Sequence, residues 1–90
     1  MRPSKNPVHP GEVLAEIYLQ DMNITQSELA RRIGCSHGKV SEIVNGRRGI
    51  SPEFALSLEL VLGTTADMWV NLQATYDLWI ARQKMKKKAG

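Results

Sequence analysis

The chain has 90 residues, of which 42% are hydrophobic and 23% are charged, and its formal net charge at pH 7 is +3. This length suits one domain and excludes an α/β barrel or a two-domain nucleotide enzyme. The single cysteine, Cys35, excludes an intrachain disulfide framework and a zinc finger built on paired cysteines. No apolar run approaches the length of about 18 residues that a membrane span needs, and residues 1–10 lack a signal-peptide core. We therefore expect a cytoplasmic protein.

Positive charge is concentrated in the middle of the chain and at its end. Residues 31–48 contain five basic residues and one acidic residue, whereas residues 49–81 contain four acidic residues and no lysine or arginine. Residues 82–90 add five basic residues. Because residues 1–30 are also net acidic, the central basic segment confines positive potential to one part of the surface, which is typical of a nucleic-acid-binding face.

The start of the chain predicts a flexible arm followed by a first helix. Residues 1–8 contain two prolines and are assigned to the arm. The helix is expected to begin near Pro10, because proline is tolerated in the first helical turn, and to end at Asn23. Apolar residues recur at helical spacing in this segment and predict its buried stripe: Val13, Leu14, Ile17, Tyr18 and Met22.

Two short helices are expected next, over residues 26–33 and 37–44. Thr25 and Ser36 are suited to cap their N-termini, and Gly34 suits the left-handed conformation that ends the first of them. Apolar residues at helical spacing predict the buried faces of both helices: Leu29, Ala30 and Ile33 in the first, and Val40, Ile43 and Val44 in the second.

The remaining sequence predicts two further helices and a tail. Ser51, followed by a proline and a glutamate, is a strong helix start, and Gly63 is the matching end. The apolar side of this fourth helix is predicted to contain Phe54, Ala55, Leu58, Val61 and Leu62. Thr65 is expected to cap a fifth helix over residues 66–84, and residues 85–90 form a solvated basic tail. Since no segment alternates as a half-buried strand does, the predicted fold is all-α.

The two short helices have the lengths and the glycine-containing turn of a helix-turn-helix, over residues 26–45. Such a motif requires a small residue where the helices cross, a residue in the turn that tolerates a conformation disfavoured by a Cβ atom, and apolar residues facing the core. Ala30, Gly34, and Val40 with Ile43 meet these requirements. An ordinary helical hairpin would share these features. The basic residues in and around the second helix favour DNA binding.

The segments TQSELARRIG (25–34) and VSEIVNGRR (40–48) resemble the helix-turn-helix of phage-repressor-like regulators. Further segments narrow the resemblance to HigA-type antitoxins of bacterial toxin–antitoxin operons, which include VapI-like regulators: HPGEVL (9–14), ISPE (50–53), ADMWVNLQ (66–73) and YDLW (76–79). The resemblance covers roughly residues 9–80 and implies a single five-helix, lambda-repressor-like domain over residues 9–84. Members of that family are dimers that bind operator DNA and silence a co-expressed ribonuclease toxin, HigB.

The resemblance places the DNA contacts in the helix-turn-helix and just after it. Gln26 is expected to meet phosphate, and the first residues of the second helix, His37, Gly38 and Lys39, are expected to meet base edges. Gly38 departs from the pattern because it has no side chain to read a base. Five further residues are expected to contact DNA, mainly at its phosphates: Ser36, Ser41, Asn45, Arg47 and Arg48. For Arg31 and Arg32, phosphate contacts and solvated surface charges remain equal alternatives.

The last predicted helix carries an aromatic seam. Its residues, spaced by three, four and three positions, are Trp69, Leu72, Tyr76 and Trp79. Trp69 and Leu72 are expected to pack partly within the chain. Because the seam extends further than a four-helix core needs, we expect it to form a dimer contact.

Other functional classes have weaker support. The segment GCSHGKV (34–40) has one residue too few between its glycines for a phosphate-binding loop and lacks the final serine or threonine. Cys35 and His37 lack a full set of metal ligands, and no catalytic constellation is apparent, so we expect no metal, no cofactor and no enzymatic activity.

The sequence thus predicts an antitoxin of a HigB-like ribonuclease toxin that also represses its own operon. We expect a homodimer, associated with the bacterial nucleoid, that binds an inverted-repeat operator in double-stranded DNA and has no contact with membranes. A phage-type or restriction-controller repressor without a toxin is one alternative. A protein-interaction module that binds no DNA is another.

Overall fold

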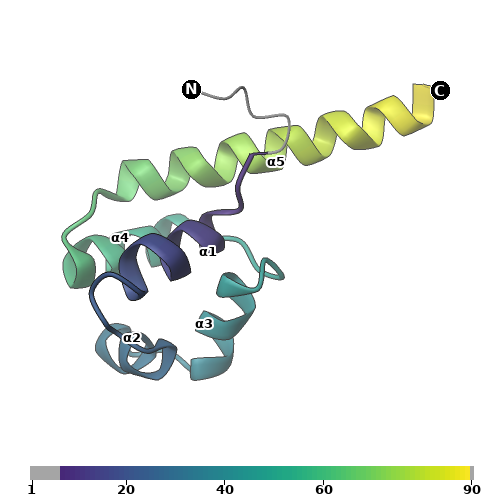
Figure 1. Cartoon of the computed structure of the whole chain (residues 1–90). Helices are drawn as coiled ribbons and strands as arrows, with labels where there is room; N and C mark the ends of the chain where they lie inside the picture. Colours follow the sequence, from purple (N-terminus) through teal and green to yellow (C-terminus); the bar gives the residue numbers. More distant parts are fainter. Residues whose placement is uncertain (1–6, 90) are drawn as a thin grey trace.

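The computed structural model describes residues 7–89, and this part of the chain is helical without a strand (Figure 1). In chain order the elements are α1 (Pro10–Val13), the π-helical turn η1 (Leu14–Leu19), α2 (Gln26–Ile33), α3 (His37–Val44), α4 (Pro52–Leu62) and α5 (Ala66–Ala89). Since α1 and η1 together form the first predicted helix, the five-helix, all-α fold is confirmed. Residues 1–6 of the predicted arm lie outside the described residues.

The ends of the helices follow from local sequence chemistry. The hydroxyl oxygens of Thr25, Ser36 and Ser51 each accept a hydrogen bond from the backbone N–H three residues later, at 3.0 to 3.1 Å. Gly34 and Gly63 have φ angles of 87° and 77° and end α2 and α4. These caps satisfy backbone groups that have no partner inside the helix, so the predicted starts of α2, α3 and α4 are confirmed.

The second half of the first helix differs from the prediction. Hydrogen bonds in η1 span five residues, and the wider turn changes which side chains face the core. Leu14 and Leu19, five positions apart, are buried, whereas Ile17 is 53% exposed and Met22 is 44% exposed. The prediction that Ile17 and Met22 belong to the buried stripe is therefore wrong, because it assumed a regular period of 3.6 residues.

One apolar cluster holds the helices together. α2 and α3 pack against each other, α4 packs against α2 and against the first part of α5, and α1 contacts both α3 and α5. Burying each large aliphatic side chain contributes about 1.5–3 kcal/mol to the free energy of unfolding. The fully buried side chains include Leu14, Leu29, Val40, Ile43, Leu58 and Trp69. The apolar residues predicted for α2, α3 and α4 all lie in this cluster or against it.

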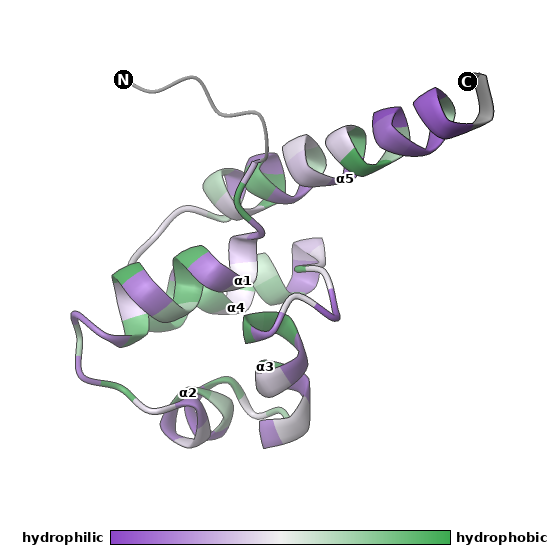
Figure 2. Cartoon of the chain, turned by 45° about the vertical axis from the view of Figure 1, so that its right-hand side comes forward, coloured by the Kyte–Doolittle hydropathy of each residue, from purple (hydrophilic) through white to green (hydrophobic). Residues whose placement is uncertain are grey.

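Helix α5 runs past the rest of the domain. The hydroxyl of Thr65 accepts a hydrogen bond from the backbone N–H of Met68 at 3.3 Å, and the helix continues to Ala89 instead of ending near Lys84. The predicted tail is therefore largely helical, because lysine, methionine and alanine are good helix formers and lysines complement the negative end of the helix dipole. Figure 2 shows this projecting end as strongly hydrophilic. Within residues 7–89, no helix has the length and apolar character to cross a membrane.

Candidate nucleic-acid interface

Helices α2 and α3 form the helix-turn-helix, on the side of the molecule opposite α5 (Figure 1). The backbone N–H groups of Gly34 and Cys35 both donate to the carbonyl of Ala30, at 2.8 and 3.0 Å, which closes α2 and begins the turn. Val40 and Ile43 of α3 are fully buried against the core. Since a helix presents only one face to the core, the other face of α3 is left exposed to solvent.

None of the nine predicted DNA-contacting residues is buried. Gln26, Lys39 and Ser41 are partly exposed. The other six are exposed: Ser36, His37, Gly38, Asn45, Arg47 and Arg48. The structure thus leaves every predicted residue accessible to a ligand, and it places them all on α2, on α3 or in the segments next to α3.

The first turn of α3 is capped, and the side chain of Lys39 in this turn packs against α4. Ser36 Oγ accepts a hydrogen bond from the backbone N–H of Lys39. The Lys39 ammonium lies 5.4 Å from the centroid of the Phe54 ring in α4. A cation–π contact at an exposed site contributes about 0.5–1 kcal/mol. A good base contact contributes about 1–3 kcal/mol, so Lys39 can leave the ring for a base.

The polar residues at the end of α3 are held by their neighbours to different degrees. Asn45 Nδ2 donates to the carbonyl of Ser41 at 2.9 Å, and Arg48 forms an ion pair with Glu42 at 2.8 Å. The backbone N–H of Arg47 donates to the carbonyl of Glu42 at 2.8 Å, which fixes the path of the chain. Among residues 7–87, the exposed side chain of Arg47 forms no ion pair, so its charge is available to a phosphate.

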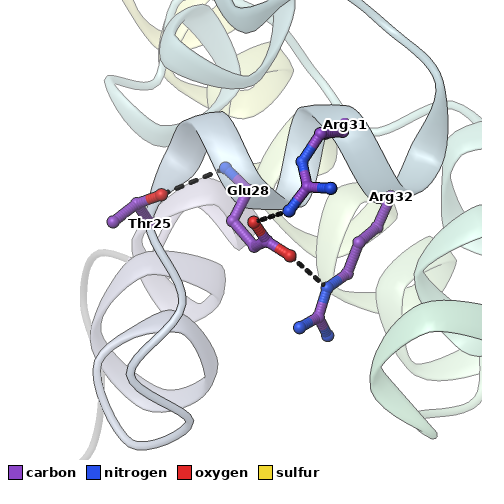
Figure 3. A network of polar contacts seen from close by, with 4 residues as sticks. All are labelled: Thr25, Glu28, Arg31 and Arg32. Carbon is purple, nitrogen blue, oxygen red and sulfur yellow. Dashed lines mark hydrogen bonds and ion pairs between the residues drawn. The ribbon is translucent and has the colours of Figure 1, made fainter.

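Arg31 and Arg32 share one carboxylate on the surface of α2. Figure 3 shows Glu28 between them, with one oxygen bound by Arg31 and the other accepting a hydrogen bond from Arg32 Nε at 2.9 Å. The hydrogen bonds from Arg31 and then from Arg32 lower the pKa of Glu28 below its ordinary value. Two guanidinium groups and one carboxylate leave a net positive charge, and arginine has further N–H donors. This arrangement fits a phosphate contact and a solvated surface equally well.

A glutamine of α5 fixes the segment that follows α3. Gln73 Oε1 accepts a hydrogen bond from the backbone N–H of Ile50 at 2.8 Å, and Gln73 Nε2 donates to Asp77 at 2.9 Å. A Cβ atom on Gly49 would lie 3.0 Å from the Gln73 amide, so the backbone approaches α5 closely here. The spacing of residues could not predict this contact, because a polar residue that binds a backbone segment looks like any solvated one.

His9 links the start of α1 to α5. Its Nδ1 accepts a hydrogen bond from the backbone N–H of Gly11 at 2.9 Å, and its ring packs edge-on against Tyr76 with 4.9 Å between centroids. Burial lowers the pKa of His9 below its ordinary value, although the negative charges of Asp77 and Glu12 act in the opposite direction. His9 is therefore favoured in its neutral form in the folded chain.

The predicted aromatic seam divides into a buried part and an outer part. Trp69 is fully buried and packs against Tyr18, with 5.4 Å between ring centroids, and Leu72 packs against the core. Tyr76 and Trp79 lie further along α5, only partly buried, with 6.3 Å between ring centroids. The assignment of Trp69 to an interface needs correction, because the core of its own chain leaves this side chain no surface for a second chain.

Comparison with known proteins identifies the class and then the family. The sequence matches the family model described as helix-turn-helix over residues 16–69. Antitoxin HigA-1 of Vibrio cholerae is 37% identical over 90 residues, which cover 99% of this chain and 85% of HigA-1.

Two solved structures extend the likeness to the fold. Pseudomonas aeruginosa antitoxin HigA, solved with the higBA promoter, has a TM-score of 0.88 and 37% identity, covering 93% of this chain and 91% of that one. Antitoxin GraA in complex with its operator has a TM-score of 0.85 and 35% identity, covering 99% of this chain and 90% of that one. Fold and site together define a helix-turn-helix DNA-binding protein. Within that class, the chain belongs to the family of HigA antitoxins.

Proposed function

We propose that this chain binds the operator of its own operon and represses transcription, and that it neutralises a HigB-like ribonuclease toxin encoded with it. The DNA-binding part of the proposal depends on one observation, which is the exposed face of α3 with its capped first turn and with Arg47 and Arg48 in the segment that follows the helix. The likeness to antitoxins solved with promoter and operator DNA supports the same conclusion. The chain would act in the bacterial cytoplasm, on the nucleoid.

The division of roles follows from the grooves of DNA. The major groove, about 12 Å wide, admits an α-helix, and α3 is the exposed helix whose first turn would meet the base edges. His37 and Lys39 supply hydrogen-bond donors there. Gln26 at the start of α2 and Arg47 after α3 would bind phosphates, which set the position of the protein on the duplex and not its sequence preference.

A second copy of the chain would supply the second half-site. We assign the dimer contact to the outer part of the aromatic seam, Tyr76 and Trp79, together with Leu72 beside it. Ile80 and Gln83 line the same apolar hollow as Trp79 on α5. Two chains related by a two-fold axis would present two α3 helices about 34 Å apart, which requires an inverted-repeat operator.

A binding titration tests the DNA-binding part of the proposal. The probes are a labelled duplex from the region upstream of the gene and a scrambled duplex of the same composition. We expect the upstream duplex to bind at least about 10³-fold more tightly, and log K to fall linearly with log of the salt concentration. Equal affinity for the two duplexes would overturn the proposal.

Co-expression tests the antitoxin part. The protein encoded next to this chain is expressed from an inducible promoter, alone and together with the chain. We expect growth to stop in the first case and to be restored in the second. If the chain binds its operator but does not restore growth, it is a repressor without antitoxin activity.

A further inference from the structure

At almost every glycine that the structure describes, a feature of the chain itself explains why glycine is required. Gly34, Gly46 and Gly63 have φ angles between 77° and 87°, which residues with a Cβ atom rarely adopt. A Cβ on Gly11 would lie 1.7 Å from the carbonyl oxygen of Ile43, and a Cβ on Gly49 would meet the Gln73 amide at 3.0 Å. Conformation or close packing therefore accounts for these five positions.

Neither backbone conformation nor close packing explains the glycine at position 38. It is the second residue of α3, and its φ angle lies outside the left-handed region. Apart from its two chain neighbours and the nearby backbone of its own helix, no part of the chain lies within 4 Å of a Cβ built on it. The residue is exposed. Glycine also destabilises a helix relative to alanine, because it loses more backbone entropy on folding. Within residues 7–89, nothing in the chain favours glycine at this position.

We infer that Gly38 sets how closely the recognition helix approaches DNA and thereby determines operator specificity. The inference rests on the proposed function, in which the first turn of α3 enters the major groove. The open space beside Gly38 would then be filled by the duplex, and the absence of a Cβ lets the helix backbone come against it. Gly38 acts as a positioning residue for its neighbours His37 and Lys39.

The expected effect of an added methyl group follows from the distance dependence of hydrogen bonds. A Cβ at position 38 would hold the helix further from the base edges, and hydrogen bonds are lost when the donor–acceptor distance grows beyond about 3.5 Å. Contacts from long arginine side chains to phosphates tolerate such a shift, because these side chains are flexible. Specific binding should therefore weaken much more than nonspecific binding.

The experiment compares wild type, Gly38→Ala and Gly63→Ala on the upstream and scrambled duplexes, with thermal unfolding followed by circular dichroism. For Gly38→Ala we expect the midpoint of unfolding to rise by about 2–4 °C. We expect its affinity for the upstream duplex to fall at least about tenfold and its affinity for the scrambled duplex to change less than about twofold. Gly63→Ala, at a left-handed position away from α3, should lower the midpoint and leave both affinities of the folded protein unchanged.

The outcomes separate the inference from the proposed function. If wild type discriminates between the duplexes and Gly38→Ala does so equally well, the inference is wrong and the proposed function stands. If Gly38→Ala is less stable than wild type, position 38 is not open and the inference is also wrong. If wild type itself does not discriminate, the proposed function fails and the inference fails with it.

Discussion

Several charged side chains around the helix-turn-helix already have partners within the chain. Arg48 pairs with Glu42, and Lys39 lies over the Phe54 ring. Exposed ion pairs contribute only about 0–1 kcal/mol, so phosphates can displace the carboxylate at little cost. Such pairs also restrict the side chains before DNA arrives, which lowers the entropy lost on binding. Arg47 provides a simpler test of the phosphate contacts, because no such partner competes for it within residues 7–87.

Arg47→Ala should weaken binding to the upstream and scrambled duplexes by the same factor. Because one phosphate contact is lost, the slope of log K against log salt should become shallower by about one. Dissociation constants measured over a series of KCl concentrations check this, with Arg82→Ala on α5 as the control that should keep the wild-type slope. An unchanged slope for Arg47→Ala would remove this residue from the phosphate contacts.

Lys39→Ala should lower affinity for the upstream duplex by about 1–3 kcal/mol and relax the preference at one base pair. The matched variant Lys39→Met keeps an apolar stem over the Phe54 ring, so it should lose base preference with less effect on stability. Titrations with duplexes altered one base pair at a time measure the preference. Equal losses on specific and scrambled DNA would show that Lys39 does not read a base.

His9 should make stability depend on pH. Its pKa in the folded chain is lowered, whereas the unfolded chain has the ordinary value of 6.5. Between these two values the unfolded chain binds more protons than the folded chain. The contribution of His9 to the free energy of unfolding is therefore fully present above the unfolded-state pKa, and it is lost as the pH falls through that value towards the folded-state pKa. Protonation also removes the Nδ1 lone pair that accepts the hydrogen bond from Gly11.

Urea unfolding at a series of pH values between about 5 and 8 measures this dependence. The free energy of unfolding of His9→Gln should fall less on acidification than that of wild type. If His9→Gln and wild type lose stability in parallel, the titration of His9 is not linked to folding.

At the scale of the helices, local chemistry predicted the starts of α2, α3 and α4 and their buried faces, whereas one face of the first helix and the end of α5 differed from the prediction. Thr25, Ser36 and Ser51 cap as expected, because a cap depends only on residues within one turn. The exposure of Ile17 was not predictable, since no local signal marks a π-helical turn. The length of α5 was underestimated because its lysines suggested a solvated end, although lysine is a good helix former.

In the candidate site, the features encoded by neighbouring residues were predicted, whereas the contacts between distant segments were not. Spacing predicted the helix-turn-helix of α2 and α3, because both its turn and its buried face are encoded within 20 residues, and the family resemblance placed the DNA contacts on it. The contacts of Gln73 and His9 join segments far apart in the sequence. Such tertiary contacts have no periodic signature, so only the structure could reveal them.

Gln73→Ala should destabilise the chain and weaken operator binding together. The substitution leaves the backbone N–H of Ile50 without its acceptor, which costs about 1–3 kcal/mol for a buried donor and less here because the site is partly exposed. It also frees the segment that carries Arg47. Urea unfolding and the titration on the upstream duplex measure the two effects.

The control for this prediction lies on the same helix. Asn71→Ala removes an exposed amide of α5 that belongs neither to the aromatic seam nor to this contact, and it should be close to neutral in stability and in DNA affinity. If Gln73→Ala and Asn71→Ala behave alike, the contact between α5 and the segment after α3 has no energetic role.

At the scale of the whole molecule, the DNA-binding helices and α5 occupy opposite sides (Figure 1). Trp69 belongs to the part of α5 that completes the core, and Trp79 belongs to the part that extends past it. We therefore expect the two tryptophans on this helix to have different roles, Trp69 in folding and Trp79 in association. Substituting each of them separates folding from association.

Trp69→Ala should cost about 3–5 kcal/mol of stability, because it empties a fully buried site. Trp79→Ala should keep its helical content and instead shift the protein from dimer to monomer, with a matching loss of operator affinity. Circular dichroism and sedimentation velocity measure the two properties. A Trp79→Ala variant that remains dimeric, or one that unfolds, would place the dimer contact elsewhere.

The central claim is that two copies of α3 read one operator. A hydroxyl-radical footprint of the wild-type protein on the upstream DNA tests it most directly. We expect two protected half-sites, related as an inverted repeat on one face of the duplex, with centres about ten base pairs apart. Protection of a single half-site would contradict the claim. Uniform protection of the whole duplex, increasing with protein concentration and independent of sequence, would contradict it as well.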